Sequence, residues 1–317
     1  MLSQIIYFKR HVGAILACWN EPVKFWRKGA SCMKNIDIST VKKIMAEVAA
    51  EEVMPRFRRL DQGDIHDKGK NDPVTVADRA AEAAISKRLG DLLPGSSFVG
   101  EEGCFSNPSN ISLLSSAGDV WVIDPIDGTR NFIEGRTEFA VMVALVRNSQ
   151  TVAAWIHDPN TGHTLEAERG SGVWLGENKM RLSGAEPESP CVGLIGSRVM
   201  YSILEKPDFA PVLSSLPALL IGSPVSYNYA RMFAGDLFFA NSDAPRASFS
   251  IYSGSKPWDH MPGLFMVSEA GGFAADMRGL PYDARREKSG LLVAQNADRW
   301  ADLRKTMEPI VREIAFC

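Results

Sequence analysis

The sequence predicts an α/β protein, with an α+β half at residues 35–183 followed by an α/β half at residues 184–317. In the first half, four short runs rich in β-forming residues follow one another with turn residues between them, which predicts an antiparallel meander. In the second half, strand-like and helix-like patterns alternate, which is typical of an α/β arrangement.

Two helices are expected near the start, at residues 39–57 and 75–92, because apolar side chains recur there at helical spacing. Thr75 and Asp78 form a capping pair at the start of the second helix. The polar residues 61–72 between the helices are expected to form a loop.

Strands and further helices are expected downstream. The meander is expected to use residues 139–146, 151–156, 163–168 and 172–175, after an apolar run at residues 121–123. The second half is expected to contain a strand at residues 191–196, a helix ending near Leu219, and helices at residues 227–234 and 260–270.

The composition is that of an ordinary globular protein, with 45% apolar residues, 23% charged residues and a net charge of −3. The weak negative charge predicts no general attraction to nucleic acid or to an anionic membrane. The five cysteines lack CxxC spacing, which argues against a disulfide framework and indicates the reducing cytoplasm. The five histidines lack the paired spacing of a zinc site.

Residues 1–34 are expected to be a disordered N-terminal extension, with a small docking element as the alternative. The apolar run at residues 12–19 follows Lys9 and Arg10, as in a signal peptide. However, the run is too short to span a bilayer, and no cleavage-site pattern follows it.

The most informative segment is residues 121–132, where an apolar run leads into Asp124, Asp127, Gly128 and Thr129. Both aspartates could be ordinary turn residues. Asp124 directly follows apolar residues, however, and an unpaired carboxylate there is costly. If other acids converge, like charges about 4 Å apart repel by about 4 kcal/mol at an effective dielectric near 20. Carboxylate and carbonyl oxygens suit a divalent cation such as Mg²⁺, and clustered amides suit phosphate.

Four further acidic residues extend this pattern. Glu101 and Glu102 end another apolar run and could be a solvated pair or part of a metal site. Asp259 begins a helical segment and could be a helix N-cap or a metal ligand. Asp78 could serve only the capping box, or could also face a catalytic site.

These motifs resemble the inositol monophosphatase family of Mg²⁺-dependent, lithium-sensitive phosphatases. The resemblance rests on Glu101-Glu102, the sequence DPIDGT at 124–129 and Trp258-Asp259. Residues 68–78 resemble a fourth motif, and the whole resemblance covers residues 35–300. It implies a layered αβαβα sandwich and a homodimer.

The resemblance also implies roles for individual residues around two or three Mg²⁺ ions. One ion would be held by Glu101, Asp124 and the Ile126 carbonyl, and another by Asp124, Asp127 and Asp259. Thr129, Asp78 and Glu101 would activate the attacking water, supported by Glu102 and Lys68. The residues implied to contact phosphate or substrate are Asp127, Gly128, Thr129, Asp259, and, by position, Ser197 and Tyr252.

The sequence departs from the family in the region that would face the substrate. Inositol-type members carry a Glu where this chain has Tyr252, seven positions before Asp259. Residues 235–258 are also longer than usual and are expected to form a flexible, partly basic loop containing Arg246. Ser197, Arg198 and Ser223 are further pocket candidates by position.

The expected function is a Mg²⁺-dependent phosphomonoesterase that acts on an inositol 1-phosphate-like substrate by direct attack of a metal-activated water. Alternative substrates are histidinol phosphate, sugar phosphates or bisphosphates, and 3′-phosphoadenosine 5′-phosphate. An alternative from another class is a regulatory protein that acts on the transcription machinery. The mild acidity disfavours direct RNA binding.

Overall fold

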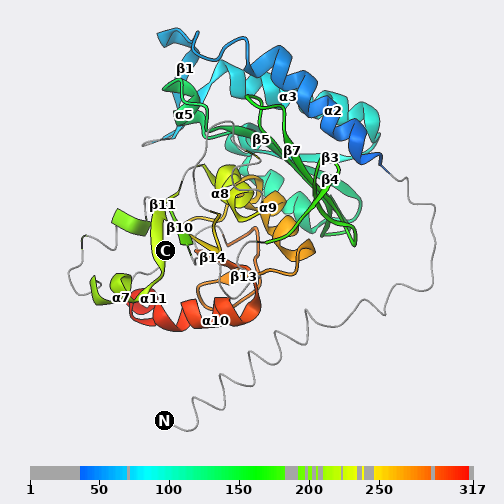
Figure 1. Ribbon diagram of the computed structural model, residues 1–317. Helices are drawn as coiled ribbons and strands as arrows, with labels where there is room; N and C mark the ends of the chain where they lie inside the picture. Colours follow the sequence, from blue (N-terminus) through cyan, green and yellow to red (C-terminus); the bar gives the residue numbers. More distant parts are fainter. Residues whose placement is uncertain are drawn as a thin grey trace, which may run out of the picture.

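The computed structural model describes residues 36–313, apart from residues 70–71, 183–191, 197–198, 202–204, 206–209, 223, 234–237, 239–245 and 287–289. The expected extension and the candidates Ser197, Arg198 and Ser223 therefore lie outside the described residues. In the described part, helices and sheets stack in five layers (Figure 1). The expected αβαβα architecture is confirmed. No helix in this part is long and apolar enough to cross a membrane.

The first layer consists of two helices, α2 (Ile38–Val48) and α3 (Val76–Leu92). A π-helical turn, Ala49–Val53, extends α2. Thr75 caps α3 in a reciprocal capping box with Asp78, as the sequence predicts. The expected loop at residues 61–72 is only partly a loop. It contains a 3-10 turn (Gln62–Asp64) and the strand β1 (Ile65–Asp67), which pairs antiparallel with β2 (Pro73–Thr75).

The second layer is a sheet of seven strands in the order β3 to β9. From β4 onward the strands form an antiparallel meander, as predicted, and β3 joins parallel to β4. The strands are β3 (Ser97–Gly100), β4 (Asp119–Asp127), β5 (Ala140–Arg147), β6 (Gln150–His157), β7 (Thr164–Glu168), β8 (Gly172–Leu175) and β9 (Asn178–Met180).

Both faces of this sheet are covered, which explains why β4 reads as a continuous apolar run. Trp121 and Ile123 pack into the core shared with α2 and α3. Val120 and Val122 pack into the core on the other face, which includes residues of α8 (Val225–Phe233) and α9 (Pro257–Glu269). Alternate residues of β4 therefore pack against the helices of the first layer on one face of the sheet. On the other face they pack against the third layer, which α8 and α9 form.

The fourth layer is a sheet of five strands in the order β11-β10-β12-β14-β13. The strand β10 is parallel to β11 and β12, whereas β14 is antiparallel to β12 and β13. The strands are β10 (Val192–Ile195), β11 (Ala218–Ile221), β12 (Phe249–Tyr252), β13 (Phe273–Asp276) and β14 (Leu291–Ala294). The remaining helices are α4 (Glu101–Ser106), α5 (Thr129–Ile133), α7 (Ala210–Ser215), α10 (Ala297–Thr306) and α11 (Glu308–Glu313). Figure 1 shows α10 along the outer side of this sheet.

Two expectations are wrong in this half. The helix expected to end near Leu219 gives way to β11, because residues 218–221 pair with β10. The segment at 235–258 is not a loop throughout, because residues 249–252 form β12 in the middle of the sheet. The sequence of a four-residue segment does not distinguish strand from helix until its pairing partners are known.

Candidate active site

The two aspartates of the central motif are the sixth and ninth residues of β4, rather than members of a turn as the sequence suggested. The ladder between β4 and β5 shifts register between Asp124 and Asp127. In a regular strand, residues three apart face opposite sides, so this irregularity brings the two carboxylates together. The charge of Asp127 raises the pKa of Asp124, after burial and the charge of Glu101.

The turn after β4 depends on glycine. Gly128 has a φ of 96°, in the left-handed region. A Cβ placed on it would lie 2.7 Å from Pro224 Cγ and 2.9 Å from the Glu138 carbonyl oxygen. The turn therefore excludes larger residues and leads directly into α5, which begins at Thr129. Nearby, the carboxylate of Asp127 accepts the Ser226 backbone N–H at 2.6 Å, which ties β4 to α8.

Thr129 and Asp78 meet as the family resemblance implied. The Thr129 hydroxyl lies 3.0 Å from Asp78 Oδ1 and 3.0 Å from the Ile126 carbonyl oxygen. It has a single hydrogen, so it donates to one of the two at a time. The other oxygen of Asp78 accepts the Thr75 N–H at 2.8 Å and the Thr75 hydroxyl at 2.6 Å. Asp78 therefore both caps α3 and contacts Thr129.

Lys68 joins the paired glutamates. Its ammonium lies 2.5 Å from Glu101 Oε1 and 2.8 Å from Glu102 Oε1. The Lys68 side chain is only 3% exposed. Burial alone would lower the pKa of Lys68, but the two glutamates raise it above its ordinary value. The pair is therefore not a solvated loop pair, and Lys68 stays charged beside it.

Asp259 is the third residue of α9, and Lys256 is the N-cap. The N-cap interpretation of Asp259 is therefore wrong. Burial raises the pKa of Asp259 well above its ordinary value, and the charges of Glu101 and Asp127 raise it further. Lys256 and Lys68 act in the opposite direction. These effects place Asp259 in one electrostatic group with acids of the other half of the chain.

We call Asp78, Glu101, Asp124, Asp127 and Asp259 the carboxylate cluster. At its centre, Asp124 is 1% exposed, and burial and then the four other members raise its pKa. Burial raises the pKa of Glu101 to about 7 and that of Asp78 to about 6, although hydrogen bonds to each act in the opposite direction. Buried acids gathered in this way need a positive charge to ionise together.

The chemistry of the cluster fits a divalent cation. Its donors are carboxylate oxygens, together with the Ile126 carbonyl, and hard cations such as Mg²⁺ prefer oxygen ligands. Among the described residues, no three His, Cys, Asp or Glu side chains are arranged so that they could hold one metal ion together. Glu101 is engaged with Lys68. A cation bound by Glu101 would therefore compete with the ammonium for this carboxylate.

The pH dependence of stability checks this electrostatic description. Without divalent cations, the melting temperature is expected to fall as the pH rises from about 4 to about 7. Asp78 and Glu101 have raised pKa values of about 6 and 7, so the folded state binds protons that the unfolded chain has released. Their stabilising contribution is complete below the unfolded pKa values and is lost as the pH rises through the folded ones.

The measurement is calorimetry across this pH range in EDTA and in Mg²⁺. The cation is expected to flatten the dependence, because it supplies the missing positive charge. A melting temperature in EDTA that rises with pH across the whole range would contradict the description.

Comparison with known proteins identifies the architecture. The sequence matches the profile of the inositol monophosphatase family over residues 30–313. The chain belongs to the inositol monophosphatase family. The family assignment predicted from the motifs is confirmed, and membership supports a phosphatase function.

Individual family members show how close the similarity is. The chain is 31% identical to a fructose-1,6-bisphosphatase/inositol-1-monophosphatase of Thermotoga maritima over 218 residues, 68% of this chain and 76% of the relative. It is 30% identical to the Nus factor SuhB of Pseudomonas aeruginosa over 264 residues, 83% of this chain and 93% of the relative. The solved structure of a Thermotoga maritima IMPase has a TM-score of 0.70 at 27% identity, covering 87% of this chain and 98% of that one.

Within this inositol monophosphatase fold, Tyr252 lies in β12 and is only 5% exposed. Its ring stacks on Tyr229 at a centroid distance of 5.8 Å and forms a T-shaped contact with the His260 ring at a centroid distance of 4.7 Å. His260 Nδ1 lies 3.0 Å from the Tyr229 hydroxyl oxygen. The aromatic side chain at this position therefore contributes mainly to the core. A contact between Tyr252 and the substrate stays a prediction. Only the small exposed part of the side chain is available for such a contact.

Three residues of the site were missed by the sequence analysis. Lys256 lies 5.1 Å from the Trp258 ring centroid, and its charge lowers the pKa of Asp259. Ser226 provides its N–H to Asp127, and no local pattern predicts a contact between residues 99 positions apart. Glu82 follows Asp78 by one helical turn on α3. This i to i+4 spacing was the available signal.

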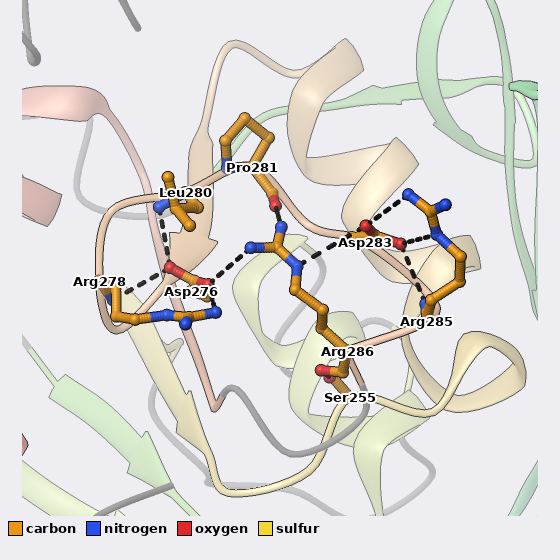
Figure 2. A network of polar contacts seen from close by, with 8 residues as sticks. All are labelled: Ser255, Asp276, Arg278, Leu280, Pro281, Asp283, Arg285 and Arg286. Atoms are coloured by element: carbon orange, nitrogen blue, oxygen red, sulfur yellow. Dashed lines mark hydrogen bonds and ion pairs between the residues drawn. The ribbon is translucent and has the colours of Figure 1, made fainter. Parts of the chain in front are cut away.

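Figure 2 shows a network that braces the segment leading into α9. The Asp276 carboxylate accepts the Leu280 N–H at 2.8 Å and lies 3.4 Å from Arg286 Nη1. The Ser255 hydroxyl donates to the Arg286 carbonyl at 3.0 Å. Ser255 precedes Asp259 by four positions, so the connection between β13 and β14 holds the chain where it enters the site.

A cavity of about 700 Å³ lies elsewhere, between α9 and residues 281–286. Met261, Leu264, Phe265 and Arg169 are among the residues that line it, and no member of the carboxylate cluster does. Its two acids, Glu269 and Asp283, are accompanied by Arg169, Arg285 and Arg286, so it lacks a cluster of carboxylates without cationic partners. The carboxylate cluster is therefore the candidate active site.

Proposed function

We propose that this protein is a Mg²⁺-dependent phosphomonoesterase that hydrolyses a small phosphorylated alcohol by direct attack of water. The hydrogen bond between Thr129 and Asp78, beside the buried Asp124, carries this proposal. It places a hydroxyl and a carboxylate of raised pKa next to acids that can bind cations. Membership of a phosphatase family supports the same reaction class.

The cation ligands are those that the family resemblance implies. Glu101, Asp124 and the Ile126 carbonyl would hold one Mg²⁺ ion, and Asp124, Asp127 and Asp259 a second. Bound cations lower the pKa of water and neutralise charge on the phosphate and the leaving oxygen. The two halves proposed for the chain, residues 35–183 and 184–317, both contribute, because Asp259 belongs to the second.

The protein's own groups orient the attacking water. With a pKa of about 6, Asp78 is mostly ionised at pH 7 and can accept the Thr129 hydrogen. The Thr129 oxygen then has lone pairs available to accept a hydrogen bond from water. Proton transfer along this pair would leave the oxygen of the water ready to attack phosphorus in line. The amides after Asp127 would bind the phosphate oxygens, and Gly128 allows their close approach.

The first substrate class is inositol 1-phosphate and similar alcohol phosphates. One relative named in the comparison supports a wider choice, because it is a fructose-1,6-bisphosphatase/inositol-1-monophosphatase. Histidinol phosphate, sugar bisphosphates and 3′-phosphoadenosine 5′-phosphate stay alternatives. Tyr252 replaces the Glu expected to bind ring hydroxyls, so the site lacks one hydrogen-bond acceptor for a polyhydroxyl substrate.

The substrate experiment compares kcat/KM in Mg²⁺ for inositol 1-phosphate, histidinol phosphate, a sugar bisphosphate and 3′-phosphoadenosine 5′-phosphate. Inositol 1-phosphate is expected to be hydrolysed no better than at least one of the others, because the acceptor at position 252 is missing. Arg246 is exposed on the segment leading into β12 and could pair with a second anionic group. Arg246→Ala is therefore expected to lower kcat/KM most for the doubly phosphorylated substrates.

The matched control is Arg285→Ala, which removes an exposed guanidinium from the loop shown in Figure 2. It is expected to leave the substrate preference unchanged. A strong preference of the wild type for inositol 1-phosphate over the other three would show that the argument from Tyr252 is wrong. Failure to release phosphate from any of them, with or without Mg²⁺, would overturn the phosphomonoesterase proposal.

A regulatory function is the second candidate, because a 30% identical relative is a Nus factor. Binding to the transcription machinery would not require turnover. A pull-down of RNA polymerase that survives Asp124→Asn would support it, whereas no retention at low salt would argue against it.

We also propose that the protein works as a homodimer in the cytoplasm. Gel filtration with light scattering tests the dimer.

A further inference from the structure

Glu82 forms a contact that links two elements of the candidate site. It lies on α3, one helical turn after Asp78, and its side chain is partly buried. Its Oε2 accepts the Glu102 N–H at 2.8 Å, and its Oε1 accepts the Gly103 N–H at 2.8 Å. Both oxygens of one carboxylate thus bind the first turn of α4.

This contact meets a need of α4 itself. The first N–H groups of any helix lack acceptors within the helix. The N-cap of α4 is Gly100, which has no side chain and makes no side-chain cap. With six residues, α4 is also too short to be stable alone. Glu82 therefore supplies from α3 the cap that the local sequence does not provide.

The fit between the two elements is close. A Cβ on Gly100 would lie 2.3 Å from the Glu82 carboxylate carbon, and one on Gly103 would lie 3.2 Å from Glu82 Oε1. The first clash involves the carboxylate group itself, which is held by two hydrogen bonds. Glycine at position 100 is therefore what lets the carboxylate reach the α4 backbone.

Glu101 depends on this arrangement, because it is the first residue of α4. Its backbone lies between Gly100, which packs on Glu82, and Glu102, which donates to Glu82. The same helix, α3, holds Thr129 through Asp78. Two successive acids on one face of α3 thus hold the hydroxyl proposed to orient water and the carboxylate proposed to bind a cation.

We propose that Glu82 is a positioning residue that sets the direction of Glu101 for cation binding by capping α4 from α3. The proposal rests on the proposed function, because only that function assigns a bound cation to Glu101. Glu82 touches neither substrate nor cation in this scheme. Its effect is therefore expected in the affinity for Mg²⁺ rather than in the chemical step.

The principal test is Glu82→Gln, which keeps the size of the side chain. The amide presents one oxygen and one NH₂ group, so one of the two backbone N–H groups of α4 faces a donor. The Mg²⁺ dissociation constant, measured by titration calorimetry, is expected to rise by about 10- to 100-fold, the usual effect of removing a partner that orients a metal ligand. The kcat at saturating Mg²⁺ is expected to change less.

Three comparisons separate this role from a general loss of stability. Glu82→Asp keeps two acceptor oxygens and is expected to recover part of the Mg²⁺ affinity. Gly100→Ala, which displaces the Glu82 carboxylate without altering it, is expected to reproduce the weaker binding. The matched control is Asp91→Asn, which removes an exposed carboxylate from the same helix and is expected to leave Mg²⁺ affinity unchanged.

Hydrogen exchange provides a readout that is independent of metal and activity. The amides of Glu102 and Gly103 are expected to exchange faster in Glu82→Gln than in the wild type. Mg²⁺ affinity within twofold of the wild type in Glu82→Gln would overturn this inference and leave the proposed function standing. A wild-type protein that does not bind Mg²⁺ would overturn both.

Discussion

Replacing Asp124 by Asn is expected to abolish phosphate release and to raise the melting temperature of the metal-free protein. Asp124 is 1% exposed, and the charges of four other acids act on it. Asn keeps an oxygen that can accept the Ile126 N–H, which lies 3.1 Å from Asp124 Oδ1, so the fold is retained. The loss of one negative charge relieves repulsion but removes the carboxylate shared by both proposed cations.

The expected thermal effect is about 2–4 °C for each 1 kcal/mol of repulsion relieved. Calorimetry in EDTA measures it, and phosphate release in Mg²⁺ measures turnover. Asp119→Asn is a matched control at the other end of β4, where Asp119 pairs with Arg147 at 2.5 Å. Loss of this pair is expected to lower the melting temperature slightly while turnover is retained.

The two variants of β4 are therefore expected to change stability and activity in opposite ways. Substantial turnover by Asp124→Asn would exclude Asp124 from the mechanism. Wild-type activity that EDTA does not diminish would contradict the metal mechanism as a whole.

Thr129→Ala is expected to lower kcat by about 10²- to 10⁴-fold, the usual range for general acid–base catalysis, with a smaller change in KM. The substitution removes the hydroxyl that lies 3.0 Å from Asp78 Oδ1, so the proposed proton path to this carboxylate is broken. Thr129→Ser keeps a hydroxyl and is expected to retain most of the activity.

Asp78→Asn is expected to cause a loss similar to that of Thr129→Ala, because a neutral amide is a poor proton acceptor. If the two residues act as a unit, the double variant loses little more than either single variant. Full additivity of the two losses would show that they act separately. Near-normal kcat in Thr129→Ala would remove Thr129 from the reaction.

Short-range patterns explain which elements could be predicted. The capping box of Thr75 and Asp78 and the continuous apolar run of β4 involve neighbouring residues, so they are visible in the sequence. The meander follows from turn residues at regular intervals. The sequence did not reveal β11 or β12, because a segment of only four residues becomes a strand only where another strand supplies hydrogen bonds.

The acidic residues of the candidate site and the pairing of Thr129 with Asp78 were predicted, but several other contacts of the site were not. Glu102 was expected to support the site, and the structure shows it bound to Lys68. Glu82 was overlooked, because its partners on α4 are 20 and 21 positions away. Tyr252 was expected in a loop, and the pairing of β12 with β10 and β14 places it in the core instead.

The sequence by itself determined the family, the α/β class and the set of acids available for catalysis, because motifs, periodicity and caps are encoded by residues close together in the chain. Only the tertiary structure decided which groups act on one another. Thr129 reaches Asp78 across 51 positions, and Asp127 reaches Ser226 across 99. The raised pKa of Asp124 has the same origin, because burial and the convergence of distant charges arise only when the layers pack.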